Sequence, residues 1–232
     1  MNRKIILAVA VLFIVVLSAA CNAAAPQAAQ EAPAADAAPT EAPAEEAVAE
    51  SADVADGAAT YTVDDAASVV EWYGSKPIGA SESGTVAVVE GALSFEGSEL
   101  VDGQVVIDMT SIETTSQSGD MANMLVGHLS SDDFFGVETY PTANLVIKSA
   151  QPTGEEGQYA VVADLTIKET TEEIEFVADV VVGEGTIEAT ADIVVDRSIY
   201  DVRYNSGTFF SDLGDDLISD EMELTVKLVA GL

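Results

Sequence analysis

Basic residues are scarce in this chain: Lys and Arg together number 8, against 41 Asp and Glu, and the formal net charge is −33. A protein that binds nucleic acid neutralises phosphates with Lys and Arg, so this charge balance excludes a nucleic-acid partner. It also disfavours contact between the folded part and an anionic lipid surface.

Cysteine and histidine are also scarce and occur once each. One cysteine cannot form an internal disulfide or a Cys-rich zinc site, and one histidine cannot build a multi-His metal centre. We therefore predict no metal site and no cofactor. Hydrophobic residues still make up 48% of the chain, so the acidic residues must surround a core rather than form a plain disordered chain.

The first residues have the pattern of an export signal. A short basic start precedes an apolar run from Ile5 to Leu17, which is too short to cross a hydrocarbon core of ~30 Å comfortably. The Leu-Ser-Ala-Ala-Cys sequence ending at Cys21 resembles a bacterial lipoprotein signal, in which the cysteine is diacylated, although Leu17 stands one position farther out than usual. The alternatives are a short transmembrane anchor and an ordinary cleavage site. The resemblance implies a signal peptide over 1–20 and a lipid anchor at Cys21. It also implies an extracytoplasmic, membrane-anchored protein of the bacterial cell envelope, on the periplasmic side or at the cell surface.

Residues 21–58 are predicted to form a tether. The segment is rich in Ala, Pro and Glu, and it cannot bury enough apolar surface to offset its ordering entropy. Its prolines break any long helix, and its acids repel one another, so we expect a disordered, semi-extended linker. It would join the anchor to one domain over 59–232, a length typical of a single domain.

Apolar and polar residues alternate along most of this domain. Ala163, Leu165 and Ile167, for example, alternate with Asp164, Thr166 and Lys168, and similar runs recur up to Leu228. Alternation with period two indicates strands that have one dry and one wet face, which is typical of antiparallel sheets. Short turns rich in Gly and acids separate these long strands, which favours a meander that closes into a barrel.

One segment has helical spacing instead. Met121, Met124, Leu125 and Leu129 recur at this spacing, and Asp120 is the expected N-cap of a helix over about 119–129. Methionines on a helix over a barrel would form an adaptable lid; the alternative is that they belong to an ordinary core.

Short blocks of distinctive sequence follow one another along the domain: Tyr61–Asp64 with Ser68–Glu71, Ile107–Ile112, Gly127–Phe135, Tyr140–Ala143, Asp164–Lys168, Asp196–Ser198 and Leu213–Asp220. In this order they resemble the YceI-like family, secreted bacterial lipocalin-like barrels that bind polyisoprenoids or related lipids. Two positions depart from the family pattern: Glu169 stands where Gly is usual, and Ser75–Ala80 replaces a His-Leu-Gly-Val-like segment. The second departure falls at the expected pocket mouth and leaves the ligand open.

The resemblance implies an all-β fold, an eight-stranded antiparallel barrel with a long apolar cavity and a short capping helix. Small inward residues from several strands leave a void unless something fills it, and we expect a hydrocarbon chain to do so. The alternative is a solid core filled by the barrel's own aromatic and methionine side chains. The predicted apolar lining is Trp72, Phe95, Ile107, Met109, Met121, Met124, Leu125, Phe134, Phe135, Leu145, Ile147, Ala163, Leu165, Phe176, Ala178, Ala189 and Ala191.

The polar candidates are few. His128 lacks a second histidine or a nucleophile motif, so we interpret it as a structural residue at the helix C-terminus, near Asp132 and Asp133. The acidic cluster at Asp212, Asp215, Asp216, Asp220 and Glu221 lacks the spacing of a calcium loop, so we interpret it as solvated turns.

Two arginines, Arg197 and Arg203, should pair with carboxylates such as Asp196, Asp201 or Asp216. The alternative is that Arg203, with Tyr200 and Tyr204, contacts a ligand headgroup at the mouth.

These observations predict a non-enzymatic carrier that sequesters a polyisoprenoid, an isoprenoid quinone or a similar long-chain lipid. Two alternatives remain: an envelope structural domain with a filled core, and a quinone-linked electron-transfer partner. The oligomeric state is left open.

Overall fold

Residues 58–232 are described by a computed structural model, and the predictions for the signal, Cys21 and nearly all of the tether lie outside them. Among the described residues, no helix is both long and apolar enough to cross a bilayer. The elements are β1 (Ala59–Val63), β2 (Val69–Ser75), β3 (Ser81–Glu96), β4 (Glu99–Thr114), α1 (Gly119–Ser130), β5 (Thr142–Pro152), β6 (Gln158–Ile167), β7 (Thr170–Val182), β8 (Thr186–Asp196) and β9 (Glu221–Gly231), with short 3₁₀ turns at Arg197–Tyr200 and Gly214–Asp216.

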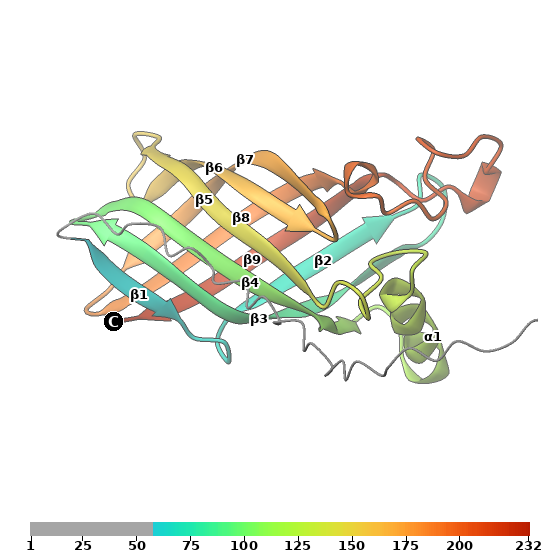
Figure 1. The fold of residues 1–232 in the computed structure, drawn as a ribbon, viewed down its shortest axis with the longest axis horizontal. Helices are drawn as coiled ribbons and strands as arrows, with labels where there is room; N and C mark the ends of the chain where they lie inside the picture. The colour runs from blue at the N-terminus through green and yellow to red at the C-terminus, as the bar shows by residue number, and fades with distance from the viewer. Residues whose placement is uncertain (1–57) are drawn as a thin grey trace, which may run out of the picture. The chain divides into compact units, whose positions relative to one another are not determined.

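The strands form one closed antiparallel barrel (Figure 1). From β2 to β9 each strand pairs with the next along the chain, and β9 returns to β2. Nine strands occupy eight positions, because β1 and β2 lie end to end between β3 and β9: Thr62 pairs with Gly231, and Val69 pairs with Lys227. The structure thus confirms the predicted eight-stranded barrel, with its first strand interrupted at 64–68.

The two longest strands, β3 and β4, bend around the barrel. Each has 16 residues, and their register shifts at three places along β3: between Thr85 and Ala87, between Val88 and Glu90, and between Ser94 and Phe95. Bulges of this kind bend a strand and increase its twist, which lets a sheet close on itself.

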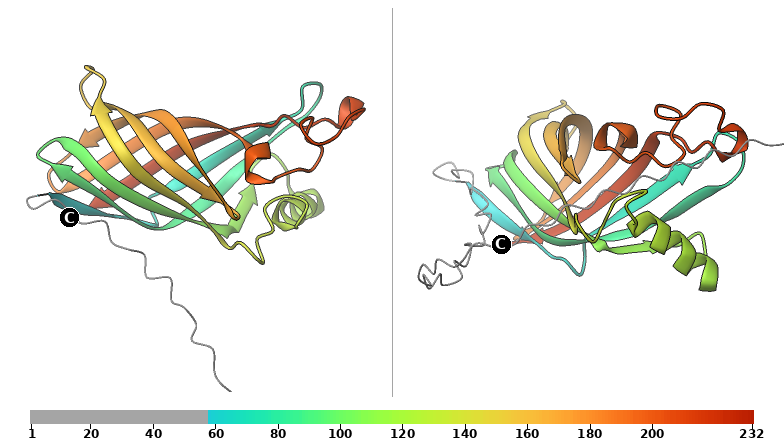
Figure 2. Two further views of the ribbon diagram at one scale, coloured as in Figure 1. Left: turned by 45° about the horizontal axis from the view of Figure 1, so that its top comes forward. Right: turned by 45° about the vertical axis from the view of Figure 1, so that its right-hand side comes forward.

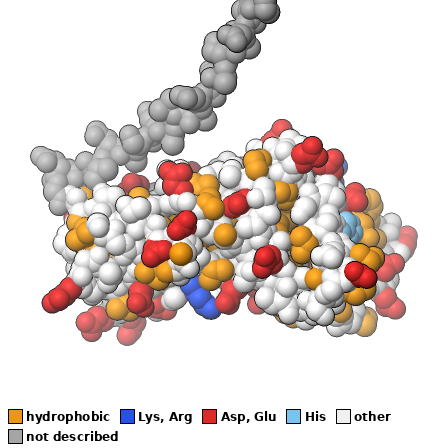
Figure 3. All heavy atoms as spheres, turned by 90° about the horizontal axis from the view of Figure 1, so that it is seen from below, with side chains coloured by type: hydrophobic (Ala, Val, Ile, Leu, Met, Phe, Trp, Pro, Cys, Tyr) orange, Lys and Arg blue, Asp and Glu red, His pale blue; other side chains and the backbone are white. Residues whose placement is uncertain are grey.

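The predicted alternation appears directly in the burial of β6. Tyr159, Val161, Ala163, Leu165 and Ile167 are buried and face the interior, while the residues between them are more exposed. The outer face is acidic: Figure 3 shows Asp and Glu side chains scattered over the surface seen from below, where Lys and Arg are few.

Helix α1 lies next to β4 at the end of the barrel where the β2–β3 loop and residues 201–220 also lie (Figure 2). Its bounds confirm the predicted helix, but its N-cap is Ser118 rather than Asp120. Ser118 is the last extended residue before the helix, so Asp120 falls within the first turn. There its negative charge interacts favourably with the helix dipole and stabilises the helix.

The family departure at Glu169 lies in the β6–β7 hairpin. The residue with positive φ there is Lys168, at 56°, and Glu169 is not in that region of the backbone map. A side chain at position 169 is therefore accommodated without left-handed strain.

Candidate functional site

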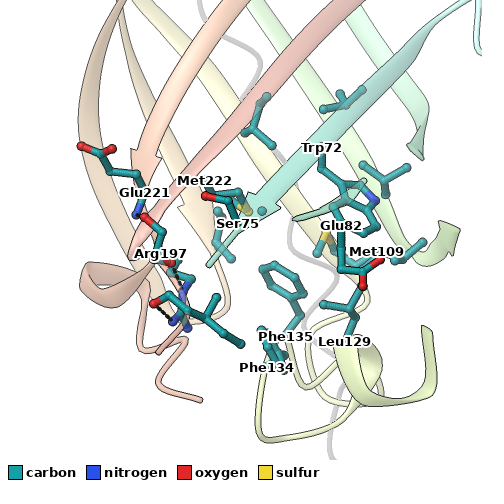
Figure 4. A pocket seen from close by; sticks show the side chains of 18 of the residues that line it. Trp72, Ser75, Glu82, Met109, Leu129, Phe134, Phe135, Arg197, Glu221 and Met222 are labelled. Carbon is teal, nitrogen blue, oxygen red and sulfur yellow. Dashed lines mark hydrogen bonds between the residues drawn. The ribbon is translucent and has the colours of Figure 1, made fainter. Parts of the chain in front are cut away.

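The barrel interior contains an apolar cavity of about 190 Å³ near α1, which we call the upper cavity (Figure 4). Strands β2, β4 and β9 supply the largest shares of its wall, while α1 and the segment after it supply Leu125, Leu129, Phe134 and Phe135. The other apolar lining residues are Val70, Trp72, Ala80, Val86, Ile107, Met109, Ile112, Ala143, Leu165, Ile167, Ile218, Met222 and Leu224.

A second, smaller cavity of about 70 Å³ lies farther along the barrel, and we call it the lower cavity. Val70 and Ile107 line both cavities. The remaining wall of the lower cavity is almost entirely aliphatic and aromatic: Leu93, Phe95, Leu100, Val105, Leu145, Ile147, Val161, Phe176, Ala178, Val180, Ala189, Thr190, Ala191, Ile193, Val226 and Leu228.

Charged and polar groups occur only in the wall of the upper cavity, apart from Thr190 in the lower one. Among these groups, Ser75 and Lys76 belong to the segment that departs from the family pattern. The Ser75 carbonyl accepts a hydrogen bond of 2.8 Å from the Ser219 amide, and Lys76 Nζ donates to the Asp215 carbonyl at 3.3 Å. These hydrogen bonds join the β2–β3 loop to the segment before β9 at this end of the cavity.

Arg197 lies at this end of the barrel, and its hydrogen bonds show what it holds. Its Nε donates to the Ser219 carbonyl at 2.9 Å, and its terminal nitrogens donate to the carbonyls of Val202 at 2.8 Å and Ile218 at 3.2 Å. A terminal nitrogen also lies 3.3 Å from Asp220 Oδ1. Burial lowers the pKa of Arg197, and Asp220 opposes that shift. Arg197 therefore fixes two loops at the barrel end.

Carboxylate pairing was predicted for both arginines, and the structure supplies the partners. Arg197 pairs with Asp220, which was not among the expected partners, while Arg203 pairs with Asp201, which was. Arg203 also lies over the Phe209 ring at 4.9 Å. Both arginines thus have structural partners.

His128 lies in the last turn of α1 and belongs to an aromatic cluster. Its ring lies edge-on to Phe134 and Tyr204, at centroid distances of 5.0 and 4.3 Å. Its Nε2 is 3.8 Å from Asp133, the turn acid expected near it. The cluster packs the end of α1 against the segment that follows β8.

Most of the predicted lining residues meet at the two cavities. Ile107 contacts both. Trp72, Met109, Leu125, Phe134, Phe135 and Leu165 line the upper cavity, and Phe95, Leu145, Ile147, Phe176, Ala178, Ala189 and Ala191 line the lower one.

Other predicted residues lie elsewhere. Met121 and Met124 do not line the interior: they are 58% and 68% exposed, because α1 turns Leu125 and Leu129 inward instead. Ala163 is fully buried but touches neither cavity, since its neighbours cover it.

The three residues proposed for the mouth do not line the upper cavity either. Tyr200 is fully buried, Arg203 is exposed beside Asp201, and Tyr204 packs on His128. These positions follow from the 3₁₀ turn after β8, which the sequence pattern did not predict.

Several lining residues were missed from the sequence, and their signal was visible. Met222 and Leu224 belong to the same alternating run as Leu228, and Val70 lies two residues before Trp72 on one strand. Period two assigns all of them to the inner face. Ile218 had no such signal, because it lies in a loop that only the fold brings inward.

Within residues 58–232, the acidic side chains form no metal-binding group, because no set of three or more His, Cys, Asp or Glu side chains is close enough to hold an ion. In the cluster around 212–221, Asp220 pairs with Arg197 and accepts a hydrogen bond from the Thr208 hydroxyl at 2.9 Å.

Solved structures with this fold include Burkholderia cenocepacia BcnA, which is 25% identical, with a TM-score of 0.55 over 72% of this chain and 99% of that chain. A polyisoprenoid-binding domain from Saccharophagus degradans, implicated in plant cell wall breakdown, is 17% identical, with a TM-score of 0.54 over 74% of this chain and 97% of its own. A mutant Campylobacter jejuni YceI protein is 19% identical, with a TM-score of 0.50 over 63% of this chain and 81% of that chain. Among curated proteins, none matches. The YceI-like domain profile matches residues 61–230, and the chain therefore belongs to the YceI-like family.

Proposed function

We propose that this barrel binds the hydrocarbon chain of a polyisoprenoid, an isoprenoid quinone or a similar lipid in its upper cavity, and so sequesters or carries it. The observation that carries the proposal is an internal space of about 190 Å³ with an apolar wall and polar groups at one end. Dry cavities of about 150 Å³ hold a benzene molecule, so the upper cavity has room for an apolar group of at least that size.

The energetics of the empty space favour a ligand. At ~24 cal/mol per Å³, an unfilled cavity of this size costs about 4–5 kcal/mol of stability. A hydrocarbon chain that enters leaves water and gains about 0.8 kcal/mol for each buried methylene. The two figures describe overlapping gains and are not added, but each favours binding of a chain over an empty cavity.

The two cavities also favour a carrier over the filled-core alternative, because that alternative expects the barrel's own side chains to occupy the interior. The family and the polyisoprenoid-binding domain of similar fold support the choice of ligand class. With the N-terminal signal and Cys21, the proposal extends to a carrier anchored by its N-terminal lipid to a bacterial envelope membrane.

The test begins with the full chain purified from a bacterial membrane. Native mass spectrometry followed by lipid extraction should reveal a bound lipid, and the delipidated protein should bind geranylgeraniol. Ala143→Phe places a ring in the upper cavity from β5, and it should weaken geranylgeraniol binding by about tenfold or more, since ring and ligand compete for one space.

The matched control is Val146→Phe, because Val146 lies on the same strand and is 40% exposed. It adds the same ring outside the barrel and should leave binding unchanged, with both variants checked for folding by circular dichroism. A wild-type protein that carries no lipid and binds neither geranylgeraniol nor a fatty-chain probe would refute the proposal.

A further inference from the structure

The two cavities are separated at one level of the barrel. Along β4 the inward residues run from Val105 in the lower cavity, through Ile107 in both, to Met109 in the upper cavity. The same division falls between Leu224 and Val226 on β9. Both β4 and β9 therefore supply wall residues to the two cavities, and the boundary between the cavities lies at the level of Ile107.

The separating residues lie on β2 and β4, the two strands that flank β3. Val70 on β2 pairs with Val86 on β3, and Ile107 on β4 pairs with Val88 on β3. Val88 is 1% exposed and lines neither cavity; as the partner of Ile107 it faces the same side of the sheet and packs beside it on the inner face. We call Val70 and Ile107 the ridge.

The ridge is stiffer than the wall above it. Val and Ile branch at Cβ and have few accessible χ1 rotamers, whereas the unbranched Met109 and Met222 of the upper cavity adapt to a ligand. A chain in the upper cavity can thus move the methionines aside, but it meets the ridge as a floor.

Lys76, Glu82 and Glu221 lie around the opposite end of the upper cavity, whose surface is otherwise almost entirely apolar. A lipid headgroup is most stable at these groups and its apolar tail at the ridge, because each avoids an unmatched environment there. The distance from the polar end to the ridge then limits how much of a tail is buried.

We propose that Val70 and Ile107 set the length of lipid tail that this protein prefers, by closing the lower cavity to it. This inference rests on the proposed function. Truncating Ile107 joins the cavities and admits a longer tail, and enlarging it raises the floor.

The test measures the affinities of geraniol, farnesol and geranylgeraniol, which differ by one isoprene unit each, for the full chain and its variants. In the wild type, affinity should stop rising once a tail reaches the ridge. In Ile107→Ala the rise should continue for one more unit, by roughly tenfold or more, because each newly buried methylene strengthens binding about fourfold. Ile107→Phe should move the plateau to a shorter alcohol.

The matched control is Leu100→Ala, which enlarges the lower cavity without touching the upper one. It should leave the plateau where the wild type has it. Ile107→Val provides a milder truncation if Ile107→Ala does not fold. A plateau that is the same in the wild type, Ile107→Ala and Ile107→Phe, while all three bind, overturns the inference alone. Absence of binding to any alcohol in every protein, including the wild type, overturns the proposed function as well.

Discussion

At the scale of single residues, the two arginines after β8 show how differently the same side chain can contribute. The Arg197 side chain is 5% exposed and satisfies three backbone carbonyls besides facing Asp220. The Arg203 side chain is 58% exposed and pairs only with Asp201 among the described acids. Sequence alone treats them alike, yet only Arg197 is part of the interior.

Arg197→Ala should therefore lower the free energy of unfolding by about 3–5 kcal/mol, because it leaves Asp220 and several buried carbonyls without their donor. Arg203→Ala is the control and should cost less than about 1 kcal/mol, as exposed ion pairs do. Urea denaturation measures both. Equal losses in the two variants would contradict this assignment.

The buried Tyr200 makes the stability of the fold depend on pH. Burial, helped by Glu172, raises its pKa to about 12, and its hydroxyl makes no hydrogen bond within residues 58–232. Since an unfolded tyrosine has a pKa of about 10, the neutral phenol stabilises the fold fully below that pH, and this contribution is lost as the pH rises toward 12.

Tyr200→Phe should change stability at neutral pH by less than about 1 kcal/mol, because no hydrogen bond is lost. Between pH 10 and about 12 the variant should lose less stability than the wild type, since it has no phenol to ionise. Denaturation curves across this range measure the difference. An alkaline decline as steep as that of the wild type would argue against the role of Tyr200.

At the scale of elements, the β2–β3 pair shows how a glycine positions a cavity wall. Trp72 pairs with Gly84 across the two strands. A Cβ on Gly84 would lie 1.8 Å from the Glu113 carbonyl oxygen and 2.5 Å from Trp72 Cζ2. The missing side chain therefore lets the indole lie over the β3 backbone, and Trp72 forms part of the upper cavity wall (Figure 4).

Gly84→Ala should destabilise the barrel by about 1–3 kcal/mol, since both the backbone of β4 and the indole must move. Gly74→Ala is the matched control on β2, where an added Cβ meets nothing within 4 Å, and it should stay within about 0.5 kcal/mol of the wild type. Thermal unfolding measures both. A tolerated Gly84→Ala together with a damaging Gly74→Ala would invalidate the packing argument.

At the scale of the whole molecule, the large negative net charge affects the stability of the fold. Most cations of residues 58–232 pair with acids: Lys148 is 2.8 Å from Glu173 and 3.4 Å from Asp164, and these hydrogen bonds raise the pKa of Lys148. Lys227 pairs with Glu71 at 2.7 Å. The formal net charge of −33 already counts every base against an acid, so these pairs do not reduce it and repulsion among carboxylates opposes the compact state.

Added salt should therefore stabilise the protein. Raising NaCl from about 20 mM to about 0.5 M shortens the screening length from roughly 20 Å to roughly 4 Å, and the Tm should rise by about 2–5 °C. Differential scanning calorimetry at neutral pH measures the shift. A constant or falling Tm would show that the exposed ion pairs outweigh the repulsion.

The sequence by itself determined the class of fold and most of the cavity wall. Period-two alternation assigns inner and outer faces along each strand whatever the strand pairs with, so residues such as Leu165 and Phe176 were placed inside before any pairing was known. The helix was identifiable for the same reason, because its 3.6-residue spacing is a local property.

Only the tertiary structure decided which inward residues meet, and where. The ridge brings together Val70 and Ile107 from distant parts of the chain. The contacts of Arg197 with three carbonyls and Asp220 depend on loops that carry no periodic signal. The rotation of α1 likewise exposed Met121 and Met124, which the pattern had placed inside. Local periodicity fixes the face of a residue, whereas strand register and loop packing fix its neighbours, and these depend on long-range contacts.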